Sequence, residues 1–335
     1  MRPGFTGLYL IQDPRGPLGD EDNLTKKKII SRIIQIIVVL FGISFLTFLL
    51  TYLAPGDPAR LMLTASGVMP TESAVEELSE RMGFNDPFLT RYFRWLTAAL
   101  QGDFGDSYTM NKPVVDLLLV RLWPTVKLTL LSMVMMLLVS IPLGMLSATH
   151  KDSWIDNFVR AFTFFGVSLP NFWVGLLLML LFCVKINIFP VICSGGDFKS
   201  IFLPALTLAI AMSSKYTRQV RTAILEELGQ DYVVGARARG ISETRILWCN
   251  VFPNSLLPLI TMLGISVGSL LGGTSVVEVI FSYPGLGNLA VSAITSSDYN
   301  LIQGYVLWIA LIYMVINLIV DISYNYVDPR MRLGR

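Results

Sequence analysis

The chain has 335 residues, of which 53% are hydrophobic and 15% are charged, whereas about 25% of residues are charged in an ordinary globular protein. This composition excludes a typical soluble domain and predicts an all-α protein that crosses a membrane several times. The net charge of +2 is too small to indicate a nucleic-acid partner. Three widely spaced cysteines without a CxxC pair predict neither a disulfide framework nor a zinc site.

The N-terminal part divides into a tail and a first membrane helix. Residues 1–28 contain several prolines and glycines without a sustained apolar period, which predicts a flexible cytosolic tail. Residues 29–53 form an apolar run that is longer than the 7 to 15 residues of a signal peptide core. We therefore expect this first membrane helix to remain as an anchor.

A polar segment follows at residues 54–123 and is predicted to lie outside the cytoplasm. It contains two stretches with helical spacing, at residues 71–82 and 87–100. The second stretch places Phe88, Tyr92, Trp95 and Leu96 on one side. This pattern predicts a small helical ectodomain that packs on the outer ends of the membrane helices, and a contact surface for an external partner is compatible with it.

Residues 124–325 contain the other predicted membrane helices. A helix needs about 20 residues to cross the ~30 Å hydrocarbon layer, and five uncharged stretches of the chain reach this length. A sixth is shorter, but it can continue through Lys215 and Tyr216 because a cation near a helix end can extend to the interface. The six expected spans cover residues 33–53, 128–149, 161–184, 200–216, 246–277 and 299–320.

The distribution of Lys and Arg predicts the orientation of these spans, because positive residues stay on the cytoplasmic side. Cationic groups precede the first span, separate the second from the third and the fourth from the fifth, and end the chain at residues 326–335. All four groups fall on one face. Both termini are therefore predicted to be cytoplasmic.

A charged run rich in small residues, DYVVGARARG at residues 231–240, lies on this predicted cytoplasmic face. We expect Asp231 to cap a helix, Ala236 and Ala238 to keep one surface shallow, and Gly240 to end the helix in a left-handed conformation. The run predicts a docking helix for a soluble partner, at about residues 231–245, and a solvated linker is the alternative. The residues expected to take part are Asp231, Tyr232, Ala236, Arg237, Ala238, Arg239 and Gly240.

The fifth predicted span carries glycines every four residues, the pattern that lets membrane helices approach closely. The small residues concerned are Gly264, Gly268, Gly272, Ser266 and Ser269. They predict either a translocation path or helix packing alone. Glu278 follows the span, where we expect it to face a substrate or a binding protein, or to be a plain interfacial carboxylate.

The segment from Asp231 to Pro258 resembles the EAA-type coupling motif of binding-protein-dependent ABC importer permeases, in the form found in the oligopeptide, dipeptide and nickel family. Asn250 stands where that family usually has a histidine. Further matches are APGDP at 54–58, GDFG at 102–105 with Ser107, SLP at 168–170 with Phe172 and Trp173, FSYPGLG at 281–287, Asp298 with Tyr299, and DPR at 328–330.

The resemblance implies the fold of a type I ABC importer permease in a bacterial or archaeal cytoplasmic membrane. It also implies three kinds of partner: cytosolic ATPase subunits, a second permease subunit and an extracytoplasmic substrate-binding protein. The chain has no phosphate-binding loop and no Gly-Lys dipeptide, so ATP and Mg are expected on the ATPase subunits, with no cofactor in this chain.

Two other classes of function fit the sequence less well. An ion-coupled carrier would keep charged relay residues within its spans, but the five uncharged spans contain none. A membrane hydrolase would need a nucleophile with a base, and the single histidine, His150, lies at a helix end beside Lys151. The preferred prediction is import of di- or oligopeptides, with nickel or a metal chelate as the alternative cargo.

Overall fold

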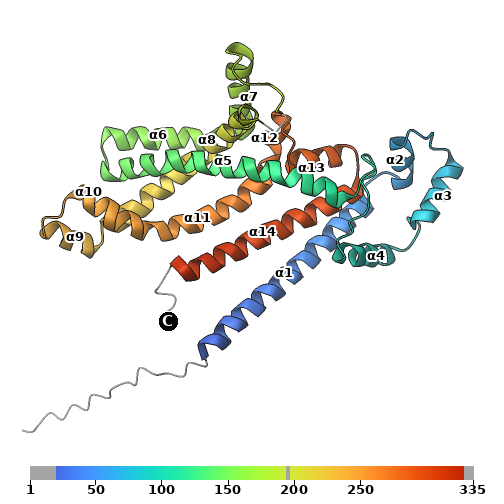
Figure 1. The fold of residues 1–335 in the computed structure, drawn as a ribbon, viewed down its shortest axis with the longest axis horizontal. Helices are drawn as coiled ribbons and strands as arrows, with labels where there is room; N and C mark the ends of the chain where they lie inside the picture. The colour runs from blue at the N-terminus through green and yellow to red at the C-terminus, as the bar shows by residue number, and fades with distance from the viewer. Residues whose placement is uncertain (1–19, 194–196, 328–335) are drawn as a thin grey trace, which may run out of the picture.

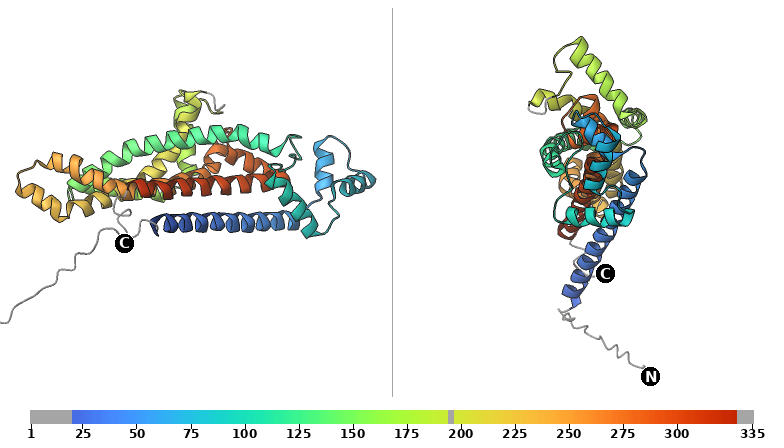
Figure 2. Two further views of the ribbon diagram at one scale, coloured as in Figure 1. Left: turned by 60° about the horizontal axis from the view of Figure 1, so that its bottom comes forward. Right: turned by 90° about the vertical axis from the view of Figure 1, so that its right-hand side faces the viewer.

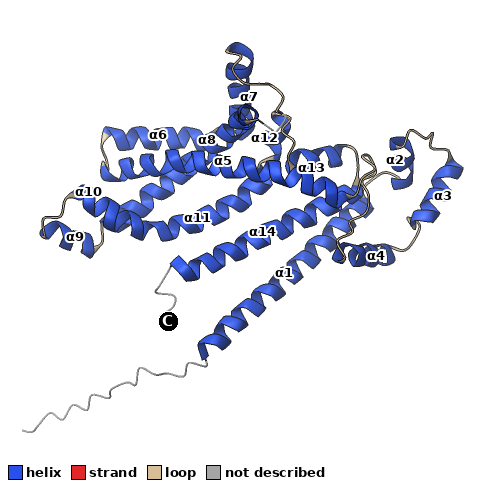
Figure 3. Ribbon diagram, in the orientation of Figure 1, coloured by secondary structure: helices blue, strands red, loops and turns tan. Residues whose placement is uncertain are grey.

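The computed structural model describes residues 20–193 and 197–327, and all regular secondary structure in these ranges is helical (Figure 3). The predicted all-α class is confirmed. The elements are α1 (Asp20–Leu53), α2 (Pro58–Ala65), α3 (Glu72–Met82), α4 (Phe88–Leu100), α5 (Val114–Thr149), α6 (Trp154–Ser168), α7 (Asn171–Met179), the π-helix η1 (Leu180–Lys185), α8 (Phe198–Leu228), α9 (Asp231–Ala238), α10 (Glu243–Ile246), the π-helix η2 (Leu247–Val251), α11 (Phe252–Gly273), α12 (Ser275–Ile280), α13 (Leu286–Thr295) and α14 (Tyr299–Val327).

The long helices run along the long axis of the molecule, and the shorter ones gather at its ends (Figures 1 and 2). Helices α2, α3 and α4 lie at one end, beyond the end of α1 (Figure 1). Helices α9 and α10 lie at the opposite end (Figure 1). The predicted ectodomain and the predicted docking segment are therefore separated by the length of the bundle.

Three helical segments are long and apolar enough to cross a membrane: Ile30–Leu53, Val114–Thr149 and Tyr299–Val320. The number rises to five if two bent helix pairs each count as one span. Helix α8, which contains the predicted fourth span, is not among them because charged residues such as Lys215, Arg218 and Arg221 interrupt its apolar run. The described residues therefore support three to five spans, and the sixth stays a prediction.

The predicted third span, residues 161–184, is not one straight helix. The chain turns by 96° between Trp154–Ser168 and Asn171–Lys185. The break follows from Pro170, which disfavours helical backbone in the preceding residue, and Leu169 is extended with φ −85° and ψ 132°. Helix α7 consequently leaves the bundle at a steep angle (Figure 1).

The predicted first span, residues 29–53, lies close to the candidate span Ile30–Leu53. Helix α1 itself begins at Asp20, within the segment predicted as a flexible tail. The rest of the predicted N-terminal tail, residues 1–19, lies outside the described residues, as do residues 328–335 with the DPR match.

The predicted ectodomain, residues 54–123, contains the two helices expected from its periodicity, α3 and α4, and also the short helix α2. Helix α3 begins after Thr71, whose Oγ1 accepts the Ala74 N–H at 3.4 Å. Helix α4 packs the ring of Tyr92 against Phe45 of α1, with 5.4 Å between the ring centroids, and Tyr92 also hydrogen-bonds Ser44 at 2.9 Å. The predicted aromatic side of α4 is therefore confirmed as the contact with α1.

The core consists of three clusters of buried apolar residues, distributed along the bundle. Helices α5 and α8 form a close pair within it. A Cβ added to Gly144 of α5 would lie 2.6 Å from Val220 and 2.9 Å from the Thr217 carbonyl oxygen of α8. Because only glycine permits this approach, α8 is tied closely to α5 near the end of the bundle that carries α9.

Candidate functional site

The segment predicted to dock, about residues 231–245, forms two separate helices, α9 (Asp231–Ala238) and α10 (Glu243–Ile246), and the end of α9 has the geometry expected for Gly240. Gly240 adopts φ +74°, the left-handed conformation that glycine favours. The Ile241 N–H donates to the Ala236 carbonyl at 3.2 Å, and the Gly240 N–H donates to the Arg237 carbonyl at 2.9 Å. These two bonds are those of a Schellman motif, so the helix ends at a defined point.

The start of α9 differs from the prediction by one residue. Gln230 occupies the N-cap position, with extended backbone at φ −77° and ψ 151°, and Asp231 is the first helical residue. The expectation that Asp231 caps the helix is therefore wrong. An acidic residue in the first turn still interacts favourably with the helix dipole, so Asp231 suits its position.

Helix α9 packs on the bundle through one face. Val233 is fully buried and Ala236 is 2% exposed, and both belong to the cluster formed with Val220 and Ile224 of α8. Ala238 points to the solvent. The two alanines do not share a shallow surface as predicted, because two residues along a helix differ by about 200° in direction.

The outward face of α9 is exposed. It carries the exposed Val234, 58% accessible, together with the exposed Gly235 and Ala238. A Cβ added to Gly235 or Gly240 would meet no atom within 4 Å. The small-residue surface is therefore real, but Gly235 and Ala238 form it in place of Ala236.

Charged and aromatic side chains stiffen the surroundings of α9. The Arg237 guanidinium donates to both carboxylate oxygens of Glu243, at 2.7 and 3.0 Å, and this hydrogen bonding raises the pKa of Arg237. Arg239 donates from Nε to the Gly235 carbonyl at 3.2 Å. Tyr232 donates to Glu227 of α8 at 2.7 Å. Both predicted rim arginines are exposed, although Arg237 is already paired within the chain.

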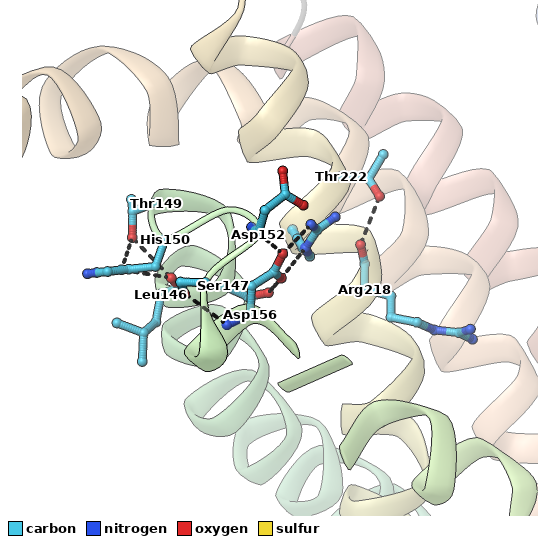
Figure 4. Close-up of polar contacts among 10 residues, drawn as sticks. Leu146, Ser147, Thr149, His150, Asp152, Asp156, Arg218 and Thr222 are labelled. Atoms are coloured by element: carbon cyan, nitrogen blue, oxygen red, sulfur yellow. Dashed lines mark hydrogen bonds and ion pairs between the residues drawn. The ribbon is translucent and has the colours of Figure 1, made fainter. Parts of the chain in front are cut away.

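A buried ion pair lies at the same end of the bundle, and no local sequence pattern indicates it. Arg221 of α8 donates from Nε and Nη2 to the two carboxylate oxygens of Asp156, each at 2.7 Å. Asp156 is fully buried at the start of α6 and also accepts the Ser147 hydroxyl at 2.5 Å (Figure 4). The pair therefore joins α5, α6 and α8 at one point, and Arg221 directly follows Val220, which belongs to the same apolar cluster as Val233 and Ala236.

His150 lies close to this ion pair in the chain but does not contribute to it. Its Nδ1 lies 3.1 Å from both the Leu146 carbonyl oxygen and the Thr149 hydroxyl, and Figure 4 shows the ring directed away from Asp156. The contacts of His150 are those of a helix end, as expected for a residue without a catalytic role.

The glycines of α11 face α14. A Cβ added to Gly264 would overlap Val320, and one added to Gly268 would overlap the Tyr313 ring. These contacts support the helix-packing interpretation for both residues. Ser266 is 8% exposed, and Ser269 and Gly272 lie outside the residues whose side chains are described. Lining of a translocation path remains a prediction.

Glu278 is not at a surface. It is fully buried and accepts the Thr125 hydroxyl at 2.8 Å and the Asn288 N–H at 2.9 Å. Because Gly285 at the N-cap of α13 has no side chain, the Glu278 carboxylate takes over the capping of that helix. The expectation that Glu278 faces a substrate, a binding protein or the interface is therefore wrong.

Two of the sequence motifs meet where the ectodomain joins α14. The fully buried Asp298 accepts hydroxyl protons from Ser107 at 2.5 Å and Thr109 at 3.0 Å. Tyr108 donates to Asn300 at 3.0 Å, and burial raises the pKa of Tyr108, which keeps its phenol protonated. This network fixes the loop after α4 to the beginning of α14.

Comparison with known proteins identifies the family. Residues 140–333 match the family described as binding-protein-dependent transport system inner membrane component, and residues 26–129 match its N-terminal counterpart. The chain belongs to this family of membrane transport subunits. The predicted family membership is therefore confirmed, and with it the assignment as a permease that is not itself catalytic.

Similar family members come from several transport systems. The metal-staphylopine import permease CntB of Staphylococcus aureus is 37% identical over 92% of this chain and 99% of its own. The oligopeptide permease AppB of Bacillus subtilis is 39% identical over 90% of this chain and 98% of its own. The glutathione permease GsiC of Escherichia coli is 35% identical over 91% and 98%.

The fold agrees with that of a solved importer. The inward-facing MetNI methionine ABC transporter matches 63% of this chain and 96% of its own chain, with a TM-score of 0.52 and 18% sequence identity. Together with the family match, this fold makes the chain a multi-pass inner-membrane permease of a binding-protein-dependent ABC importer. An ion-coupled carrier is thereby set aside.

Proposed function

We propose that this permease imports short peptides by alternating access and that a cytosolic ATPase drives it through α9. The observation that carries the proposal is the attachment of α9 to the bundle. Val233 and Ala236 bury one face of α9 in the apolar cluster that also contains Val220 and Ile224 of α8, while Val234 and Ala238 leave the other face open. A rigid helix with one bound and one free face is suited to pass a partner's movement to the membrane helices.

The long helix α8 extends this coupling through the bundle. It comprises Phe198–Leu228, 31 residues, which corresponds to about 46 Å of helix. The Arg221–Asp156 pair ties it to α6 at the end that carries α9. A displacement of α9 is therefore transmitted to α8 and α6 together.

The orientation, division and assembly of the chain are part of the same proposal. Both termini and α9 lie in the cytoplasm, and residues 54–123 lie outside, where an extracytoplasmic binding protein delivers the substrate. The permease core is residues 124–325. A second permease subunit completes the path, and ATP with Mg is bound by the ATPase subunits, as the resemblance implies.

The relatives support peptides as the first candidate substrate. AppB is named for oligopeptide transport, and DdpB of Escherichia coli, 32% identical over 89% of this chain, is named for probable D,D-dipeptide transport. CntB is named for metal-staphylopine import, which supports a nickel or other metal chelate as the second candidate.

Retention by the binding protein tests the substrate. The binding protein encoded with this chain is purified, and dipeptides, oligopeptides and a nickel chelate are offered at equal concentration. We expect peptides to be retained and to enter proteoliposomes that contain permease, ATPase and binding protein only when ATP is present. Selective retention and uptake of the chelate would replace peptides with the second candidate, and uptake without ATPase subunits would contradict the coupling proposal.

A further inference from the structure

Asp298 lies between the ectodomain and α14, and its two carboxylate oxygens contact different sides of this junction. The Oδ1 atom accepts the Leu301 N–H at 3.3 Å, which caps the beginning of α14. The Oδ2 atom accepts the hydroxyls of Ser107 and Thr109 at 2.5 and 3.0 Å, and the Thr109 N–H at 3.2 Å. Asp298 is fully buried, and hydrogen bonds to a charged acceptor are roughly twice as strong as neutral ones. One carboxylate therefore holds the loop after α4 against the first turn of α14.

Neighbouring contacts join the same loop to the beginning of α14. The Tyr108 hydroxyl donates to the Asn300 Oδ1 at 3.0 Å, and the Asn300 Nδ2 donates to the Asp106 carbonyl at 3.0 Å. At Gly304, an added Cβ would lie 3.4 Å from the Phe104 Cβ. A side chain at this position would crowd the loop, so the close approach depends on glycine.

The other end of the ectodomain contacts the same part of α14. The Tyr299 hydroxyl donates to the Pro55 carbonyl at 3.1 Å, in the segment that joins α1 to α2. One turn further along α14, the Gln303 Nε2 donates to the Thr51 hydroxyl of α1 at 2.5 Å. Both ends of the ectodomain therefore meet the beginning of α14, and the ectodomain cannot move relative to this helix without breaking these bonds.

Helix α14 is suited to carry a displacement from the ectodomain into the bundle. Its 29 residues correspond to about 44 Å of helix. It contains no proline, whereas α5, α8 and α11 each contain at least one, and proline is a common cause of helix kinks. Further along α14, Tyr313 and Val320 lie so close to Gly268 and Gly264 of α11 that an added Cβ would overlap them. The helix that holds the ectodomain is therefore also packed closely against α11.

We propose that Asp298 is a positioning residue through which docking of the binding protein on the ectodomain is passed along α14 to α11. The inference rests on the proposed function, in which a binding protein delivers the substrate outside the cytoplasm, and it adds the route by which docking is sensed. The ectodomain and α14 move as one unit against α11, which is a rigid-body movement. The route depends on the hydrogen bonds that the loop donates to Asp298.

The test removes the loop's contribution to the junction and keeps the contribution within α14. The double variant Ser107→Ala with Thr109→Val deletes both hydroxyl donors to the Asp298 Oδ2, while the bond from Leu301 to the Oδ1 remains. Thr109→Ser keeps the hydroxyl and is the conservative variant. Thr295→Val is the matched control, because the Thr295 hydroxyl lies three residues before Asp298 and donates to two carbonyls of its own helix, α13.

ATPase activity of the assembled transporter in nanodiscs is measured with and without a saturating concentration of the binding protein, loaded with the ligand that it retains in the test above. In the double variant we expect stimulation by the binding protein to fall at least about fivefold, the lower end of allosteric coupling, with basal activity unchanged. Thr109→Ser and Thr295→Val should keep the stimulation of the wild type. Tyr108→Phe removes the bond to Asn300 and should also lower the stimulation, so it reports on the junction if the double variant does not assemble.

The affinity of the binding protein provides a second measurement, because coupling between two binding sites is reciprocal. Affinity is compared between the nucleotide-free transporter and the transporter with a non-hydrolysable ATP analogue. In the double variant the ratio of these two affinities should move toward one, and in Thr295→Val it should keep the value of the wild type. A merely structural role of the junction would lower thermal stability and basal activity and leave this ratio unchanged.

Three outcomes would overturn the inference: unchanged stimulation in the double variant, an equal fall of basal and stimulated activity, or the same loss of stimulation in Thr295→Val. ATP-driven uptake by the wild-type importer is measured in the same preparation and tests the proposed function by itself. Uptake that depends on the binding protein, together with full stimulation of the double variant, rejects the route through Asp298 and leaves the transport function standing.

Discussion

Replacement of Gly240 by arginine tests the coupling role of α9 most directly. Gly240 has φ +74° and no atom within 4 Å of an added Cβ. The substitution therefore causes no clash within the chain, and its intrinsic cost is the left-handed backbone, about 1–2 kcal/mol for an L-residue. For a protein stable by about 5–15 kcal/mol, this cost leaves more than about 99% of the molecules folded.

A large loss of transport in Gly240→Arg must consequently arise at the partner. We expect uptake by the reconstituted importer to fall at least about tenfold, which corresponds to about 1.4 kcal/mol of lost docking energy. The permease should remain in the membrane, and copurification of the ATPase should decrease in parallel. Uptake of a labelled substrate and the amount of bound ATPase are the two measurements.

Gly67 provides a matched control. It also has φ +74° and no atom within 4 Å of an added Cβ, but it lies in the ectodomain after α2. Gly67→Arg carries the same backbone cost, and we expect it to leave ATPase binding unchanged. Normal uptake in Gly240→Arg, or equal loss of bound ATPase in both variants, would refute the coupling argument.

Three further predictions concern the ion pair, the helix packing and the orientation. Arg221→Ala should destabilise the permease by about 3–5 kcal/mol, because it leaves the buried Asp156 unpaired. Thermal unfolding in detergent measures this loss of stability. The control Arg218→Ala, at an exposed arginine, should change the stability little. Gly268→Leu should lower the melting temperature through overlap with Tyr313, unlike Gly42→Ala on α1, where an added Cβ meets nothing within 4 Å. A membrane-impermeant maleimide should label the exposed Cys249 in inside-out vesicles and not in intact cells. The same reagent should not label Cys193 at neutral pH, because burial raises the pKa of that thiol to about 11. Equal loss in both arginine variants, unchanged melting of Gly268→Leu, or labelling of Cys249 from outside would each contradict the corresponding expectation.

Local patterns in the sequence determined most helices and the family. Apolar runs, turn residues and periodicity act over a few neighbouring residues, so the ectodomain helices and the end of α9 at Gly240 followed from them. The break at Pro170 carried the same kind of local signal, but the long apolar run around it concealed the break. The expectation that Ala236 and Ala238 share one surface was wrong, although helical geometry alone places them about 200° apart.

The partners of buried charges were decided only by the tertiary structure. Asp156 meets Arg221 across 65 residues of sequence, and Glu278 meets Thr125 across 153. Local helix propensity does not predict these contacts, because they depend on how whole helices pack. Packing determines both whether a charge is buried and which group neutralises it. The amino-acid sequence thus specified which segments are helical, whereas the arrangement of those helices decided which side chains act together.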